Sequence, residues 1–202
     1  WALSQCIDKN KKLIVYHTGT KYRQNTDYYN ELFNPHVDIS FTDQTEFIGL
    51  GMKSEHYIAT AIDTDALIPR KELGDRLVIG HFPSNSVTKG TSKIIEMMQP
   101  HLSRCEFVVD TRIVPHDKNI QRIQQCDVYI ELFAPEQNGK PYGCFGVTAF
   151  EAASMGKIVL TQNLNQHIYE QTYGDQIFLC AETEEHFKNN IEFLLSHRHH
   201  IK

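Results

Sequence analysis

The chain has 202 residues, of which 41% are hydrophobic and 22% charged, and its formal net charge at pH 7 is −5. This composition is typical of a soluble globular protein, and the acidic balance argues against binding nucleic acid through a basic surface. No apolar run approaches the roughly 18 residues that a membrane-spanning helix needs. The five cysteines are widely spaced without a CxxC pair, so we expect reduced thiols and a cytoplasmic protein.

The eleven histidines raise the question of a metal site. They cluster only near the end of the chain, at His197, His199 and His200, and this spacing is not that of a zinc site. The sequence contains no HExxH motif and no cysteine–histidine cluster. We therefore expect neither a metal ion nor a cofactor.

The first part of the chain predicts short strands alternating with short helices. We expect strands at 12–16, 37–41 and 56–59, and helices at 26–33 and 43–50. The charged segment 63–76 contains Pro69 and Gly74 and lacks periodicity, which indicates a linker. This pattern predicts a partial α/β domain over residues 1–65.

The second part of the chain, residues 66–202, shows the same alternation more clearly. We expect strands at 77–82, 106–110, 127–132, 157–161 and 176–179, and helices at 89–98, 116–125, 146–154 and 182–196. Strands that alternate with helices of this length predict a doubly wound parallel sheet with right-handed crossovers. Such sheets bind ligands beyond the carboxyl ends of their strands.

Three loops are predicted at that edge of the sheet. In the first, 81–91, Lys89 stands at a helix start and suits phosphate oxygens. In the second, 113–116, Pro115 fixes the chain at a helix start; it either lines a flat pocket for a base or is only a connector. The third is the glycine turn that begins at Gly143.

Gly143 and Gly146 allow a tight turn before an amphipathic helix. The first N–H groups of a helix lack partners and attract anions, and Glu151 one turn further in can accept hydrogen bonds from hydroxyl groups. Any α/β connection contains similar residues, but three such loops at one edge favour a nucleotide site. Its phosphates would lie between Lys89 and the amides of Gly146–Thr148, with sugar hydroxyls at Glu151.

Two stretches resemble GT-B glycosyltransferases of the retaining family 4, also called "glycosyl transferases group 1". Residues 79–91, IGHFPSNSVTKGT, are similar to the first strand and loop of that family's C-terminal domain. The residues CDVYIELF and then YGCFGVTAFEAASMGKIVL resemble its nucleotide-sugar motif. VYHTGTKYR, HVDISFTDQTEF and YIATAIDTD resemble the end of the N-terminal domain. The resemblance implies a Rossmann-like C-terminal domain preceded by a partial N-terminal one.

The resemblance also implies residue roles. Glu151 matches the glutamate that binds the donor ribose, Lys89 matches the lysine at the diphosphate, and His81 stands where many members have an arginine. The donor site would comprise Ser84, Asn85, Lys89, Gly90, Val114, Pro115, Gly146, Val147, Thr148 and Glu151. The acceptor side would comprise His17, Gly19 and Arg23. The implied catalytic set is Glu151, Lys89, His81 and His17.

The resemblance implies transfer of a hexose from a nucleotide diphosphate sugar to a hydroxyl acceptor, with retention. No DxD motif lies in a suitable loop, so we expect a metal-independent reaction. The helix dipole, Lys89 and a protonated His81 would stabilise the departing diphosphate. The donor sugar, the base and the acceptor, whether glycan, lipid or protein, stay open.

The chain departs from the family at Gly143, where many members have a first glutamate eight positions before the second; Glu131 and Glu136 lie upstream at other spacings. It also has room for only part of the first GT-B domain. These departures favour the alternative of a non-catalytic glycosyltransferase-like module that binds a nucleotide sugar or a partner protein. A third interpretation is a sugar-nucleotide epimerase of the same architecture.

Overall fold

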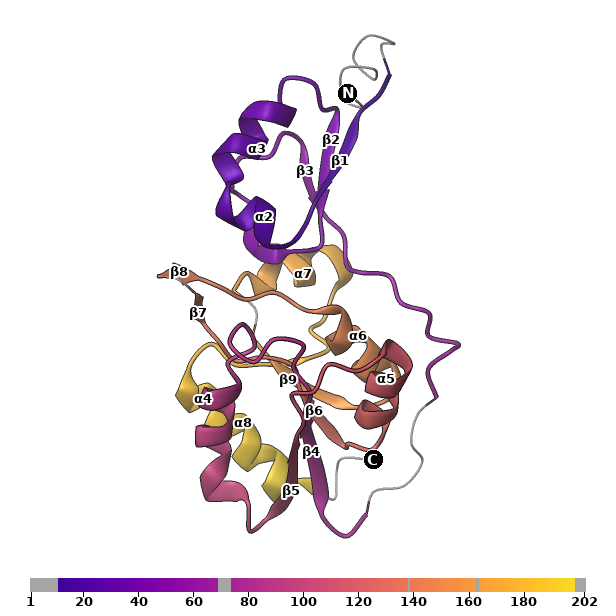
Figure 1. Cartoon of the computed structure of the whole chain (residues 1–202), viewed down its shortest axis with the longest axis vertical. Helices are drawn as coiled ribbons and strands as arrows, with labels where there is room; N and C mark the ends of the chain where they lie inside the picture. The colour runs from indigo at the N-terminus through magenta and orange to yellow at the C-terminus, as the bar shows by residue number, and fades with distance from the viewer. Residues whose placement is uncertain (1–10, 69–73, 138, 163, 199–202) are drawn as a thin grey trace. The chain divides into compact units, whose positions relative to one another are not determined.

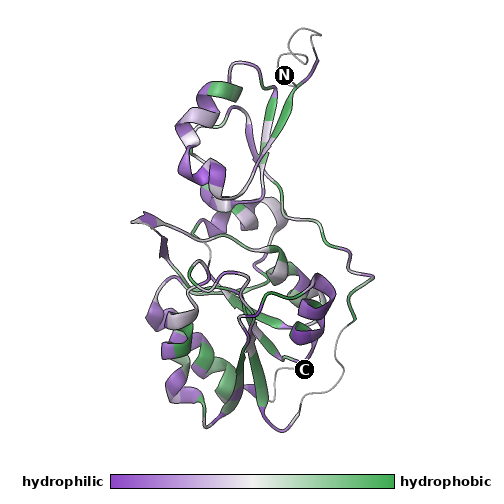
Figure 2. Ribbon diagram, in the orientation of Figure 1, coloured by the Kyte–Doolittle hydropathy of each residue, from purple (hydrophilic) through white to green (hydrophobic). Residues whose placement is uncertain are grey.

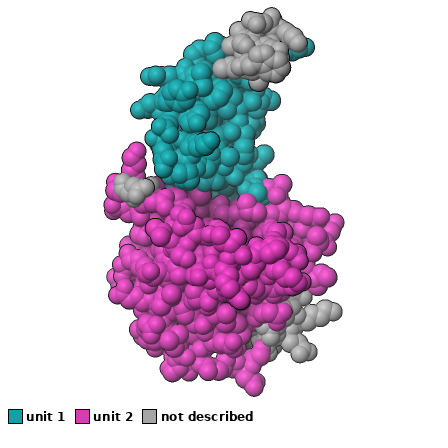
Figure 3. All heavy atoms as spheres, viewed as in Figure 1, with its two compact units in different colours: residues 1–60, 165–174 teal, residues 61–164, 175–202 magenta. Residues whose placement is uncertain are grey.

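A computed structural model describes residues 11–68, 74–137, 139–162 and 164–198 of the chain (Figure 1). The chain forms two compact units: residues 1–60 with 165–174, called unit 1, and residues 61–164 with 175–202, called unit 2 (Figure 3). The first break lies near the predicted boundary at residue 65. Residues 165–174, which we expected in the second domain, belong to unit 1.

Unit 1 contains a three-stranded parallel sheet in the order β1-β2-β3. Its strands are β1 (Ile14–His17), β2 (Ile39–Thr42) and β3 (Glu55–Tyr57). Its helices are α2 (Gly19–Gln24), α3 (Thr26–Phe33), α7 (Gln166–Tyr173) and the 3-10 turn η1 (Thr45–Phe47). A small core of Tyr22, Phe47 and Met52 lies beneath these elements.

Unit 2 contains a five-stranded parallel sheet in the order β10-β9-β6-β4-β5. Its strands are β4 (Leu77–His81), β5 (Cys105–Val109), β6 (Val128–Ile130), β9 (Ile158–Thr161) and β10 (Leu179–Cys180). Because β4 pairs with both β5 and β6, the winding direction reverses between β4 and β6. The structure thus confirms the α/β fold with parallel sheets, an arrangement compatible with a Rossmann-like fold.

Helices cover both faces of the unit 2 sheet, as Figure 1 shows. The helix α4 (Thr91–Met98), followed by the 3-10 turn η2 (Gln99–His101), packs against α8 (Glu184–Ser196). On the other face, α5 (His116–Gln124) packs against α6 (Val147–Ser154). A short hairpin of β7 (Glu136–Gln137) and β8 (Lys140–Pro141) follows β6.

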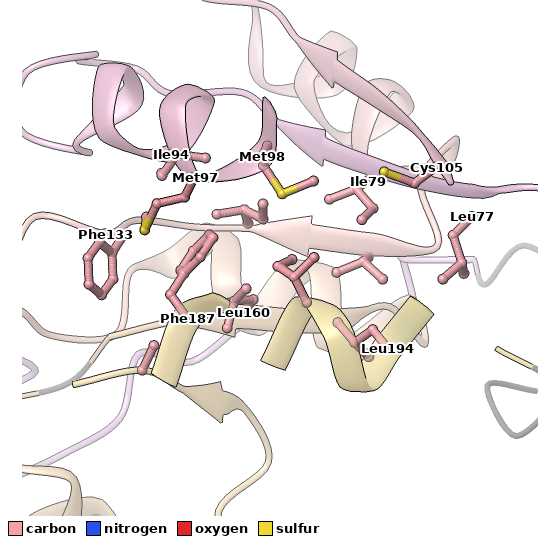
Figure 4. Packing of buried hydrophobic residues seen from close by; sticks show 14 residues of the cluster. Leu77, Ile79, Ile94, Met97, Met98, Cys105, Phe133, Leu160, Phe187 and Leu194 are labelled. Carbon is pink, nitrogen blue, oxygen red and sulfur yellow. The ribbon is translucent and has the colours of Figure 1, made fainter. Parts of the chain in front are cut away.

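The main core of unit 2 lies between the sheet, α4 and α8, and Figure 4 shows its packing. Figure 2 shows hydrophobic residues concentrated in these strands and in α8. The aromatic rings of Phe133 and Phe187 meet with centroids 5.2 Å apart. Each such buried side chain contributes about 1.5–3 kcal/mol, so this layer holds the strand ends, and the loops that follow them, in place.

Most predicted elements match the structure within one to three residues, and α3 has the predicted bounds Thr26–Phe33. The expected helix at 43–50 is only the turn η1. The sequence pattern does not identify α2, α7 or the β7–β8 hairpin. Part of the expected linker, 69–73, and His199 and His200 lie outside the described residues.

Candidate functional site

A cavity of about 380 Å³ lies in unit 2, where the strands β4 and β6 end. From β4 the chain continues to β5 on one side and then returns to β6 on the other side of β4. The point between β4 and β6 is the switch point of the sheet, where doubly wound sheets bind ligands. All three predicted loops contribute to its wall, together with Tyr129 of β6. The lining residues are Phe82, Pro83, Ser84, Lys89, Arg112, Ile113, Val114, His116, Asn119, Arg122, Tyr129, Gly146, Val147 and Thr148.

Lys89 places an ammonium group at the cavity wall. Its side chain is 18% exposed and its Nζ forms an ion pair with Oε1 of Glu131, whose side chain is fully buried. The other carboxylate oxygen of Glu131 accepts a hydrogen bond from Oγ1 of Thr161 at 3.1 Å. The carboxylate is therefore held at both oxygens, and it fixes the position of the ammonium group.

The loop that carries Lys89 is built by Asn85 and Gly90. Oδ1 of Asn85 accepts from the amides of Val87 and Thr88 at 3.1 and 3.0 Å, which closes an Asx turn. Gly90 has φ of +69°, and a Cβ there would collide with the carbonyl oxygen of Phe133. Asn85 and Gly90, which we expected in the donor site, do not line the cavity; they shape the loop that presents Lys89.

The start of α6 forms the opposite part of the wall. Gly146 is the N-cap residue, and Val147 and Thr148 form the first turn. A Cβ on Gly146 would collide with Oε1 of Glu131 and lie 3.3 Å from Nζ of Lys89. Glycine thus allows a helix N-terminus, with its unpaired N–H groups, to approach the Lys89–Glu131 pair closely.

Glu151 lies one turn further along α6, with its side chain 8% exposed. Its Oε1 is 2.6 Å from Nε2 of His116, and its Oε2 is buried without a hydrogen-bond partner among the described residues. His116 lines the cavity and Glu151 does not. Pro115 is the N-cap of α5 and lies outside the lining, so of its two expected roles the structure supports the connector.

Two arginines that the sequence pattern does not identify also line the cavity. Arg112 and Arg122 both pair with Asp110, at 2.6 and 3.0 Å. The hydrogen bonds from Arg112, with further help from Arg122, hold the pKa of the Asp110 carboxyl well below its usual range. The guanidinium of Arg122 also lies 5.1 Å from the centroid of the Phe82 ring. The cavity wall therefore contains two arginine side chains in addition to Lys89.

Tyr129 of β6 is a buried residue of the cavity lining. Burial raises the pKa of its hydroxyl well above the usual range, and the nearby Glu131 acts in the same direction. The hydroxyl is hydrogen-bonded to the side chain of Thr148. The Tyr129 hydroxyl therefore stays neutral, and its hydrogen bond links β6 to the first turn of α6.

His81 does not take the expected role of a protonated group beside phosphates. Its side chain is buried, its Nδ1–H donates to the carbonyl of Ile130 at 2.8 Å, and Oγ1 of Thr91 donates to its Nε2 at 2.9 Å. Burial lowers the pKa of His81 to about 4, and the charge of Lys89 acts in the same direction. His81 is therefore neutral at pH 7 and ties β4 to β6 and α4, outside the cavity lining.

The three expected acceptor-side residues all belong to unit 1. His17 ends β1, its ring centroid lies 4.2 Å from that of Tyr22, and burial lowers its pKa. Gly19 begins α2 with φ of +71°. Nε of Arg23 donates to Oε1 of Glu46 at 2.6 Å. The structure thus brings them together around β1 and α2 of unit 1, whereas the cavity residues belong to unit 2.

The described residues contain no group of three or more His, Cys, Asp or Glu side chains that could hold a metal ion. None of the described helices combines the length and the apolar composition of a membrane span. No protein-family model matches the chain, and no curated protein matches it at a significant level.

Proposed function

We propose that this chain is a retaining glycosyltransferase of the GT-B type, and that a nucleotide diphosphate sugar binds in the cavity of unit 2. One observation carries the proposal. Lys89 and Gly146, which come from two separate stretches that resemble the family, meet at one cavity at the switch point of the sheet. The volume of about 380 Å³ falls within the roughly 300–1,000 Å³ typical of small-molecule sites.

The diphosphate binds between Lys89 and the first amides of α6 in this proposal. Lysine and helix N-termini are both common phosphate ligands, because each offers N–H donors with positive charge. As the bond to the sugar breaks, negative charge grows on the diphosphate, and these fixed groups stabilise it without reorganisation. Since no DxD motif lies in these loops, we propose that the reaction needs no metal ion.

The nucleoside extends from the phosphates toward His116 in the same proposal. The buried Oε2 of Glu151 lacks a donor, and leaving a buried carboxylate oxygen unsatisfied costs free energy that a ribose hydroxyl would recover. When the ligand enters, the His116 ring either moves away from the Glu151 carboxylate or shares the ribose hydroxyl with it. Ile113 and Val114 supply an apolar surface for the base.

The acceptor is a hydroxyl compound, oriented by residues of unit 1. The family resemblance offers His17, Gly19 and Arg23 as candidates; of these, Arg23 is already engaged with Glu46 and Gln44 within unit 1. The wide cysteine spacing supports a reducing compartment, and we propose a cytoplasmic location on that ground.

A second candidate is a module that binds the nucleotide sugar without transfer, and Gly143 favours it. Gly143 has φ of +148°, and a Cβ there would lie 2.8 Å from Nε2 of Gln162. That amide nitrogen donates to the carbonyls of Ala134 and Tyr142 at 2.8 and 2.7 Å. The position therefore has no room for the sugar-contacting glutamate of many family members.

Saturation-transfer NMR with UDP-sugars and GDP-sugars tests the donor site. We expect wild-type protein to bind at least one of them, and Glu151→Ala to weaken binding by about tenfold or more, since a hydrogen bond to a charged group is lost. Glu136→Ala removes an exposed carboxylate of β7 and is the matched control, with unchanged binding. Absence of any nucleotide binding by folded wild-type protein would contradict the proposal.

Release of free nucleotide from a panel of donors and acceptors separates the two candidates. Sugar transfer above the rate of hydrolysis supports the glycosyltransferase. Tight donor binding without turnover, across lipid, glycan and peptide acceptors, supports the binding module. Formation of an epimerised nucleotide sugar without an acceptor would indicate the third interpretation, an epimerase.

A further inference from the structure

A carboxylate lies buried behind the wall at the phosphate end of the cavity. Glu131 follows directly after β6, and its side chain has no exposed surface. One oxygen pairs with Nζ of Lys89 and the other accepts from Oγ1 of Thr161 at 3.1 Å. Both oxygens of the Glu131 carboxylate are therefore engaged by neighbouring side chains.

This carboxylate lies close to the proposed phosphate position. Oε1 of Glu131 and Nζ of Lys89 both lie next to Gly146 at the start of α6, where a Cβ would meet each of them. An anion that touches Lys89 and the first amides of α6 therefore lies just beyond a fixed negative charge. Because the Glu131 side chain is fully buried, solvent screens this repulsion less than it would on an exposed surface.

A site built only for tight phosphate binding would leave the charge of Lys89 unopposed. Glu131 offsets that charge, and its repulsion grows with the number of negative charges on the ligand. A nucleotide diphosphate sugar has no terminal phosphate monoester, whereas a nucleoside diphosphate has one. Such a monoester loses its second proton near pH 6, so at pH 7.5 the nucleoside diphosphate carries about one more negative charge.

We propose that Glu131 is a specificity-determining residue that makes the phosphate end of the cavity discriminate by ligand charge. It weakens binding of the nucleoside diphosphate product more than binding of the nucleotide sugar donor. This inference rests on the proposed donor site. Its consequence for turnover is faster product release, because the leaving diphosphate gains negative charge beside a buried carboxylate.

Calorimetric titration of four ligands measures the discrimination directly. UDP, UDP-glucose, GDP and GDP-mannose are titrated at pH 7.5 and low ionic strength into wild-type protein and into Glu131→Gln, which keeps the size of the side chain and removes its charge. We expect the affinity for the diphosphate to rise relative to that for its sugar by roughly tenfold in the variant. Glu136→Gln makes the same charge change at an exposed site of β7, and we expect no change in the ratio.

Two outcomes contradict the proposal in distinguishable ways. If wild-type protein binds but Glu131→Gln changes both affinities by the same factor, Glu131 only positions Lys89 and the inference is wrong. If folded wild-type protein binds none of the four ligands, the proposed donor site is wrong and the inference fails with it. Glu131→Met makes the same charge change without a buried amide and replaces Glu131→Gln if that variant does not fold.

Discussion

Each unit of the molecule holds a buried carboxylate beneath a partly exposed cation, and the two pairs have almost the same exposure. In unit 1, the side chains of Arg23 and Glu46 are 20% and 4% exposed; in unit 2, those of Lys89 and Glu131 are 18% and 0% exposed. The two pairs therefore differ in their surroundings and not in their burial.

Arg23 directs its donors into its own unit. Besides Glu46, its guanidinium reaches Oε1 of Gln44 at 3.4 Å and lies 5.2 Å from the centroid of the Phe47 ring. Lys89 instead borders a cavity beside the start of α6. The comparison suggests that a planar guanidinium with several partners holds a fold together, whereas a single ammonium group at a cavity wall is available to a ligand.

The largest expected effect is on the pair of unit 1. Arg23→Met removes the guanidinium from beside the buried Glu46, and we expect the free energy of unfolding to fall by about 3 kcal/mol. Urea unfolding measures it. The double variant Arg23→Met/Glu46→Leu removes both charges and should recover most of the loss. A loss below about 0.5 kcal/mol in the single variant would show that Arg23 does not hold the fold together.

The next effect is a pH dependence that belongs to unit 2. The pKa of His81 is lowered to about 4 in the folded protein, so the unfolded chain takes up the proton first as the pH falls below 6.5. The stability that neutral His81 contributes is present above pH 6.5 and is lost between pH 6.5 and 4. We expect the free energy of unfolding to fall by about 2–3 kcal/mol from pH 7 to 4.5 on account of this group.

The variant His81→Gln isolates that contribution from those of other groups such as His17, whose pKa is also lowered by burial. We expect its unfolding free energy, measured by urea at both pH values, to depend less steeply on pH than that of wild-type protein. Equal slopes for the two proteins would contradict the assignment of a neutral, buried His81.

A smaller effect separates the two pairs by function. Lys89→Met/Glu131→Leu replaces the unit 2 pair by apolar side chains, which is often neutral for stability. Because Lys89 contacts the phosphates in our proposal while Glu131 lies behind it, we expect nucleotide affinity to fall by about tenfold or more. The unit 1 double variant Arg23→Met/Glu46→Leu is the control in the same calorimetric titration, with unchanged affinity. Equal losses of nucleotide affinity in the two double variants would contradict a ligand-binding role that belongs to the unit 2 pair alone.

The smallest effect concerns the hydroxyl that supports Glu131. Thr161→Val removes the hydrogen bond to Oε2 and keeps the shape of the side chain. We expect a loss of about 1–2 kcal/mol in the free energy of unfolding, measured by urea, because a buried carboxylate oxygen loses its donor. Since the carboxylate keeps its charge, its discrimination between nucleoside diphosphate and nucleotide sugar should persist. An unchanged stability would show that this hydrogen bond contributes nothing.

Much of the fold follows from the sequence because the strands of unit 2 are short apolar runs separated by helices of regular period. The same reasoning finds neither α2 nor α7, because each buries a single residue, Tyr22 or Tyr169, and so has no apolar stripe. The hairpin at 136–141 has two-residue strands, too short for an alternating pattern. These elements are stabilised by tertiary contacts, which the local pattern of apolar residues in the sequence does not predict.

The site follows from the sequence in part. Lys89 and Gly146 stand at helix starts, where local chemistry predicts an anion site. Glu131 and His116 act through partners 42 and 35 residues away in the chain, and no local spacing predicts such pairs. His81 shows the reverse error: a histidine at the end of a strand was predicted to face the ligand, but its ring is buried.

Amide NMR spectra recorded during titration with UDP and GDP show where the nucleotide binds. We expect the largest shifts at Val147 and Thr148, where α6 begins, and at Lys89. The amide of Arg23 should shift little. Saturating ligand without shifts at the start of α6, or with shifts confined to unit 1, would contradict the claim that this cavity binds the nucleotide.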